Sequence, residues 1–439
     1  MMRFILKIAA ILVIFFFIYN PPLKFFPVNA GMIIGFGFFV FYVAQWLFKI
    51  IASQKIIFKK EILLMVGVIV LLVAFSSFVT FFKQTGDYQI SKNYLSFLLI
   101  YLPGAFGIVQ VFKKYFTPAE LIKFFITAVV AQSLILLFMF VNPFVKDFFF
   151  SLLRDEEARI FQNRVSGGFR FLGFAFGGSW DLSIVQSVAV MLIAMNIKTG
   201  AGKNNIFTAL SFLVLMASVF LAGRTGVLGI VFALLIMMIP VTFTEIPFYR
   251  FVRFLLLFCL ITIPLFFIIK SRLPDKAVAI VETKFLPWAL EMFKNDSGNM
   301  MQTKSSNELK TMYFMPSATT FLLGDGYYKD PMDTNKYYKG TDAGYMRHLL
   351  FYGIAGCFFL IILYVVLFYQ MYRHSGVIGT SPAVKIFIVF IGLYFFLSHI
   401  KGDLLAGSNM PLKMLLFLYA VLLSYDIPKK GITLDDSNT

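Results

Sequence analysis

Arginine is the residue type that first points to chemistry in this chain. Seven of its eleven arginines fall between apolar segments on what the charge pattern makes the outer face of a membrane. Arginine binds phosphate and carboxylate groups through parallel N–H donors. We therefore expect a site for a phosphate-bearing ligand there, with loop solvation or lipid headgroup contact as the alternative. The seven are Arg154, Arg159, Arg164, Arg170, Arg224, Arg272 and Arg347.

Arg224 gives the sharpest of these signals. It lies in Ala222-Gly223-Arg224-Thr225-Gly226, a turn between two apolar segments with almost no loop. A charge at the membrane edge is costly without a partner, and glycines let the backbone approach a ligand closely. The turn predicts a bound anion, and the alternative is an arginine that extends to the headgroups.

A second group surrounds the start of the segment at 178–197. Arg164 and Arg170 lie in a glycine-rich stretch that leads to Gly177-Gly178-Ser179-Trp180-Asp181. Arginine and glycine before a helix are suited to anion recognition, and we expect Trp180 and Asp181 to contact a sugar. A flexible loop with an interfacial tryptophan explains the pattern equally well.

A third group includes side chains able to move a proton. Gly324-Asp325-Gly326 is followed by Thr341-Asp342-Ala343-Gly344-Tyr345, with Arg347, His348 and Gly353-Ile354-Ala355-Gly356 further on. Asp342 or His348 can act as a general base toward a hydroxyl group, with Tyr345 and Arg347 as substrate contacts. The alternatives are a helix cap for Asp342 and an interfacial position for His348.

The elements that must position these residues are membrane helices. The chain has 439 residues, of which 59% are hydrophobic and 14% are charged, and its mean hydropathy is +0.83. Soluble domains are about 45–50% apolar and about 25% charged, so a soluble enzyme, a disordered chain and a disulfide scaffold are excluded. We expect an all-α polytopic membrane protein with about twelve spans. They cover 4–19, 30–52, 62–82, 93–112, 120–141, 178–197, 205–222, 225–243, 252–270, 347–372, 384–400 and 408–425.

The distribution of lysine and arginine sets the expected orientation. Outside the two long loops, 17 of them lie on the same side of the membrane as the N-terminus and 5 lie in the short loops of the other side, so the positive-inside rule predicts that both termini are cytoplasmic. The net charge is +17, but the basic residues lie in short clusters between apolar segments and form no basic stripe. The pattern therefore predicts no nucleic-acid partner. The short outer loops hold only Lys24, Lys83, Lys92, Arg224 and Lys401.

We expect one integral membrane domain over residues 1–439, with two long outer loops at 142–177 and 271–346. Arg272 and Lys310 in the second loop are further candidates for substrate binding. The three histidines are far apart in sequence and lack metal-ligand spacing, so no metal is expected.

These motifs together resemble the O-antigen polymerase and ligase superfamily. The resemblance covers roughly residues 150–370 and rests on the Arg224 turn, Gly324-Asp325-Gly326, the Asp342-Ala343-Gly344-Tyr345 stretch and the Gly-x-x-Gly that begins at Gly353. It implies a GT-C-like glycosyltransferase of the bacterial inner membrane that needs no metal or cofactor. The implied donor is an undecaprenyl-diphosphate-linked glycan, bound by Arg224 and the loop arginines.

Within this superfamily the late loop favours a polymerase of lipopolysaccharide repeat units over a ligase. Ligases carry a histidine in that loop, whereas residues 271–346 contain none and Asp342 stands in the comparable place. A chain-length regulator protein is a further expected partner. The alternatives are a ligase that transfers polymer to lipid A-core and a transporter of lipid-linked sugars.

The expected orientation can be tested with topology reporters. A reporter fused after Lys203 should lie in the cytoplasm, and one inserted within 290–330 should lie in the periplasm, because lysine and arginine are retained on the cytoplasmic side. Paired alkaline phosphatase and fluorescent-protein fusions measure this. The reverse pattern would overturn an outer-face site.

Overall fold

The computed structural model describes residues 1–52, 59–154, 172–199, 206–239, 282–283, 304–379, 382–405 and 409–425. Regular structure within these ranges is helical, and eight of the helices are long and apolar enough to cross a membrane. The protein is thus an all-α, multi-pass membrane protein, as the composition predicts.

The membrane-crossing elements follow the predicted segments. The eight are α1 (Met2–Tyr19), α2 (Ala30–Ile51), α3 (Lys60–Phe82), a continuous run of α4 (Gln89–Ser96), a π-helical turn (Phe97–Tyr101) and α5 (Leu102–Phe112), then α6 (Pro118–Val141), α9 (Ser179–Thr199), α17 (Gly344–Arg373) and α18 (Pro382–Lys401). Three shorter apolar helices are α10 (Ile206–Ala222), α11 (Thr225–Met238) and α19 (Asn409–Ser424). Eleven predicted segments therefore coincide with apolar helices, while the segment at 252–270 lies outside the described residues.

The parts of the two long loops that are described also contain helices. α7 (Pro143–Ser151) follows α6 directly, and α15 (Lys304–Met312) and α16 (Ala318–Leu323) precede α17. Asn142 caps α7 by accepting a hydrogen bond from the Phe144 amide. Both segments thus carry ordered structure close to the membrane helices that they join.

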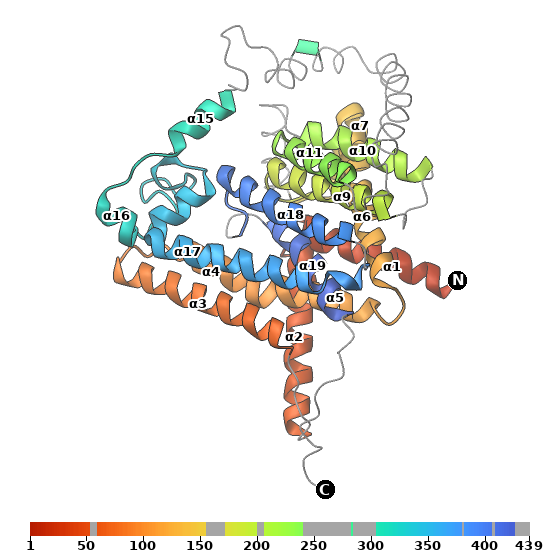
Figure 1. Cartoon of the computed structure of the whole chain (residues 1–439), viewed down its shortest axis with the longest axis horizontal. Coiled ribbons are helices and arrows are strands. Elements are labelled where there is room, and N and C mark those ends of the chain that lie inside the picture. The colour runs from red at the N-terminus through yellow and green to blue at the C-terminus, as the bar shows by residue number, and fades with distance from the viewer. Residues whose placement is uncertain are drawn as a thin grey trace.

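Two helices form the interior of the bundle. α9 is buried from Asp181 to Met195, and α19 is buried from Met410 to Leu423. α9 packs against α10 and α11, and α19 packs against α5 (Figure 1). Around them, α3 and α17 run side by side, and α2 extends away from the body (Figure 1). Exposed apolar side chains on the outer helices, such as Phe36, Phe41 and Phe78, suit contact with lipid chains.

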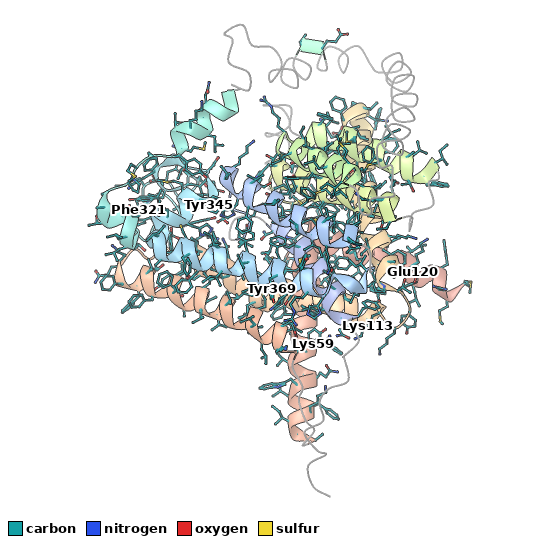
Figure 2. All side chains as sticks on the ribbon, viewed as in Figure 1. Lys59, Lys113, Glu120, Phe321, Tyr345 and Tyr369 are labelled. Atoms are coloured by element: carbon teal, nitrogen blue, oxygen red, sulfur yellow. The ribbon has the colours of Figure 1, made fainter. Side chains whose placement is uncertain are left out.

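Residues that flank the two ends of the membrane helices lie apart in the molecule. Tyr345 and Phe321 lie at one end, whereas Lys59, Lys113 and Glu120 lie toward the other (Figure 2). Any topology that alternates between the faces requires such a separation.

Helix α17 is broken near its start. Gly353 has φ 70° and ψ −166°, which is not helical. The break frees carbonyl groups of the preceding turn, and the amides of Asp325 and Gly326 donate to the carbonyls of Leu350 and Phe351 at 2.7 and 3.0 Å. Such substitute partners are needed because an unpaired backbone group in a membrane costs several kcal/mol.

The same break explains two of the glycine motifs. A Cβ on Gly353 would overlap the carbonyl oxygen of Leu322, and a Cβ on Gly324 would overlap that of Phe351. Gly324 also has a positive φ of 70°. The two backbones cross closely at this point, so both positions require glycine.

Gly353→Ala should therefore destabilise the protein. At φ 70° and ψ −166°, a region that is essentially restricted to glycine, a residue with a Cβ is strained by about 1–3 kcal/mol. The overlap with Leu322 adds to this. Thermal unfolding in detergent and membrane abundance measure the loss. Gly67→Ala is the matched control. Gly67 lies in α3, and a Cβ at this position would have no neighbour within 4 Å. Equal stability of the two variants would contradict this account of the break.

Candidate functional site

A buried polar cluster lies where the start of α17 meets the end of α18. Arg347 and His348 come from α17, His399 comes from α18, and Asp403 follows two residues after that helix. All four side chains are buried. A Cβ on Gly344 would overlap the carbonyl oxygens of His399 and Gly402, so the glycine of the Asp-x-Gly-Tyr motif permits this close approach.

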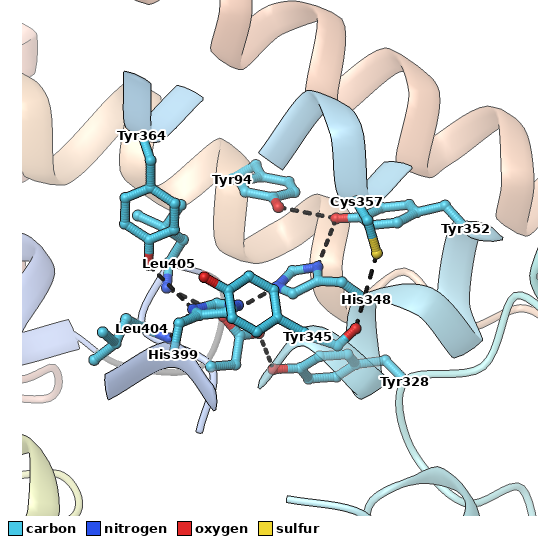
Figure 3. A network of polar contacts seen from close by, with 11 residues as sticks. Tyr94, Tyr328, Tyr345, His348, Tyr352, Cys357, Tyr364, His399, Leu404 and Leu405 are labelled. Atoms are coloured by element: carbon cyan, nitrogen blue, oxygen red, sulfur yellow. Dashed lines mark hydrogen bonds and ion pairs between the residues drawn. The ribbon is translucent and has the colours of Figure 1, made fainter. Parts of the chain in front are cut away.

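The carboxylate of Asp403 is the centre of the cluster. Its Oδ2 accepts a 2.8 Å hydrogen bond from the Tyr328 hydroxyl, and its Oδ1 accepts one from the Leu405 amide at 3.1 Å. Nε2 of His348 also lies 3.1 Å from Oδ1 (Figure 3). Burial alone would raise the pKa of Asp403, but His348, Arg347 and His399 hold that pKa well below its usual value. These three groups therefore favour the ionised carboxylate.

His348 has a polar neighbour close to each ring nitrogen. Nδ1 lies 3.0 Å from the Tyr352 hydroxyl, which is 2.9 Å from the Tyr94 hydroxyl (Figure 3). The histidine is 0% exposed. The side chain is therefore enclosed by protein and does not contact lipid headgroups. A direct role as general base is also disfavoured, because neither nitrogen is presented to a substrate.

Arg347 is stacked between two aromatic rings. Its guanidinium carbon lies 3.9 Å from the ring centroid of Tyr328 and 3.5 Å from that of Tyr337. Such cation–π contacts contribute about 2 kcal/mol each when desolvated. Its Nε and Nη2 are buried and have no hydrogen-bond partner among the described residues. Buried donors in this state suit an anionic ligand.

Asp342 lies at the exposed edge of the cluster. The first helical residue of α17 is Gly344 and its N-cap is Ala343, with no side-chain cap, so the helix-cap interpretation of Asp342 is wrong. Asp342 is exposed, and its charge interacts favourably with Arg347 and Lys329. Burial, followed by Arg347, lowers the pKa of Lys329. An accessible carboxylate thus lies near two cationic groups.

Trp180 connects the Arg224 turn with this cluster. A Cβ on Gly223 would lie 3.5 Å from Cα of Trp180, and a Cβ on Gly402 would lie 2.7 Å from Cζ2 of its ring. Arg224 itself is half-buried and precedes the first residue of α11. The Arg224 turn and the loop that carries Asp403, far apart in sequence, therefore both lie against Trp180, the first at its backbone and the second at its ring.

The remaining site residues that were predicted from the sequence lie in different parts of the chain. Asp181 is buried and its Oδ2 accepts the Gly178 amide at 3.0 Å, which gives it a role in the start of α9. The Tyr345 hydroxyl donates to the Phe396 carbonyl, and its ring contacts His399. Lys310 is exposed on α15. Arg164, Arg170 and Arg272 lie outside the described residues.

Four members of the cluster were not predicted from the sequence: His399, Asp403, Tyr328 and Tyr337. In the sequence, His399 lies at the end of an apolar segment and Asp403 lies in the loop that follows it, so neither position indicates a site. An acidic residue directly after an apolar segment is the one available signal, and it is common at helix ends.

Comparison with known proteins adds no assignment. No protein-family model matches the chain, and no curated protein is similar to it in sequence.

Proposed function

We propose that the protein is a membrane glycosyltransferase of the O-antigen polymerase type. It would extend a surface polysaccharide from repeat units carried on undecaprenyl diphosphate, at the periplasmic face of the bacterial inner membrane. The observation that carries this proposal is Arg347, a buried arginine with unpaired N–H donors beside the exposed carboxylate of Asp342. The resemblance of the surrounding motifs supports it.

The arginines supply the binding site for the leaving group. Arg347 is held flat between Tyr328 and Tyr337, so its unpaired donors are fixed in direction. Arg224 follows Gly223, which lies against the backbone of Trp180. Fixed cationic donors stabilise the negative charge that develops on a departing diphosphate. Arg224 and Arg347 thus hold the donor, with Trp180 available to contact a sugar ring.

Asp342 is the proposed general base. The hydroxyl oxygen of the acceptor sugar attacks the anomeric carbon of the donor, and the bond from that carbon to the phosphate oxygen breaks. The lipid diphosphate leaves with the electron pair, and Asp342 receives the hydroxyl proton. A carboxylate in this role contributes about 10²–10⁴-fold in rate.

His348 and Asp403 act as positioning residues in this scheme. Asp403 accepts from Tyr328, which forms one face of the Arg347 stack, and His348 follows Arg347 on α17. The pair therefore holds Arg347 in place through Tyr328 and α17, without contacting the substrate.

A transporter of lipid-linked sugars is the second candidate. Lys413 on α19 is fully buried, and its Nζ lies 4.8 Å from the ring centroid of Tyr101. Ionisable residues inside membrane helices often mark a transport path. A ligase that uses lipid A-core as acceptor would share the donor site and differ only in product.

Arg224→Lys should lose most activity and Arg224→Ala nearly all of it. Planar bidentate geometry is lost in the first variant and the charge in the second. Loss of a contact to developing charge costs about 3–4 kcal/mol, or roughly a hundred- to a thousand-fold in rate. Polymer made at matched membrane abundance is the measurement. Arg373→Lys, on the exposed end of α17, is the control, and full activity of Arg224→Ala would reject the diphosphate site.

Asp342→Asn should reduce polymer formation by about 10²–10⁴-fold with a normal protein level, because the amide cannot accept the proton. Asp333→Asn is the matched control, since Asp333 caps a turn of the same segment through the Asn335 amide. Initial rates with a lipid-linked repeat unit measure both. If Asp342→Asn and Asp333→Asn retain equal activity, Asp342 is not the base.

A further inference from the structure

Two histidines and one aspartate meet at a single point in the cluster. His348, His399 and Asp403 each place one ligand-type atom, a ring nitrogen or a carboxylate oxygen, so that the three atoms lie within 4.8 Å of one another. All three residues are buried. Nε2 of His348 faces Oδ1 of Asp403 at 3.1 Å, and Nε2 of His399 has no hydrogen-bond partner among the described residues.

We propose that His348, His399 and Asp403 bind a divalent transition-metal ion of the zinc class. Two imidazoles and one carboxylate are a common ligand set for Zn²⁺ and related ions. Ca²⁺ and Mg²⁺ prefer oxygen ligands and fit the set poorly. The proposal departs from the expectation of a metal-free protein, which rested on spacing along the chain.

Each proposed ligand is oriented by a second hydrogen bond. The Tyr352 hydroxyl lies 3.0 Å from Nδ1 of His348, and the Tyr364 hydroxyl lies 3.1 Å from Nδ1 of His399. Tyr328 donates to the Oδ2 of Asp403. Metal-binding histidines nearly always use the other ring nitrogen in this way. Coordination through Nε2 of His399 would place a proton on Nδ1, and the Tyr364 hydroxyl oxygen would then accept a hydrogen bond from it. The Leu404 amide, which donates to Nδ1 at 3.3 Å, would lose that acceptor.

The charge around the site permits a cation. Asp403 supplies one negative charge, while the Arg347 guanidinium nearby opposes cation binding. That guanidinium is stacked on two tyrosine rings, which partly balance its charge. Neutral imidazole ligands bind zinc-class ions strongly despite a low negative charge.

A bound ion would join the start of α17 to the end of α18. It would lie in the same cluster as Arg347, and its role would be to fix the two helix ends that form the cluster. This goes beyond the proposed transferase function, because metal binding can be measured without any activity.

Metal content of the purified full-length protein tests the proposal. The protein is purified in detergent through a tag that binds no metal, without chelators, and analysed by inductively coupled plasma mass spectrometry. About one zinc-class ion per chain is expected. His399→Ala and Asp403→Asn should each lower the content at least about tenfold. His374→Ala, which alters a histidine paired with Glu61, should leave it unchanged.

A second measurement keeps the result independent of misfolding in the variants. Wild-type protein treated with chelator and then titrated with Zn²⁺ should regain thermal stability, and Co²⁺ should give visible absorption bands of bound imidazole ligands. Wild-type protein that lacks the ion and responds to neither metal would overturn the proposal. Wild-type metal content in His399→Ala would also overturn it.

Discussion

The buried carboxylate of Asp403 is the constraint on which the rest of the site depends. An ionised group in an apolar interior costs several kcal/mol unless it is paired and hydrogen-bonded. Its partners come from separate segments: Tyr328 before α17, His348 within α17, and Leu405 after α18. Satisfying this charge therefore fixes three parts of the chain relative to one another.

The break in α17 lets the segment before this helix reach the carboxylate. The amides of Asp325 and Gly326 replace the helical partners lost at Gly353, which anchors that segment on the membrane helix. Tyr328 follows directly and places its ring on Arg347 while its hydroxyl reaches Asp403. The glycine motifs are thus explained by the close backbone crossing at the helix break. Arg347, which Tyr328 contacts, is the residue of this region that can bind a ligand.

The apolar segments could be predicted from the sequence because each carries its own signal, about 20 apolar residues. The site was only partly predictable. Asp342, Arg347 and His348 lie close together in sequence, and their grouping was expected, but the burial of His348 was not. His399 and Asp403 join them through the packing of α17 on α18, which no local pattern records. The link from Arg224 through Trp180 likewise depends on tertiary structure.

Reconstitution tests the central claim most directly. The purified protein is placed in liposomes with a defined oligosaccharide on undecaprenyl diphosphate, and products are separated by size. A transferase gives a ladder of longer lipid-linked glycans together with free undecaprenyl diphosphate, without any added nucleotide. Donor that stays unchanged in size, or that only crosses the bilayer, would contradict the account and favour transport.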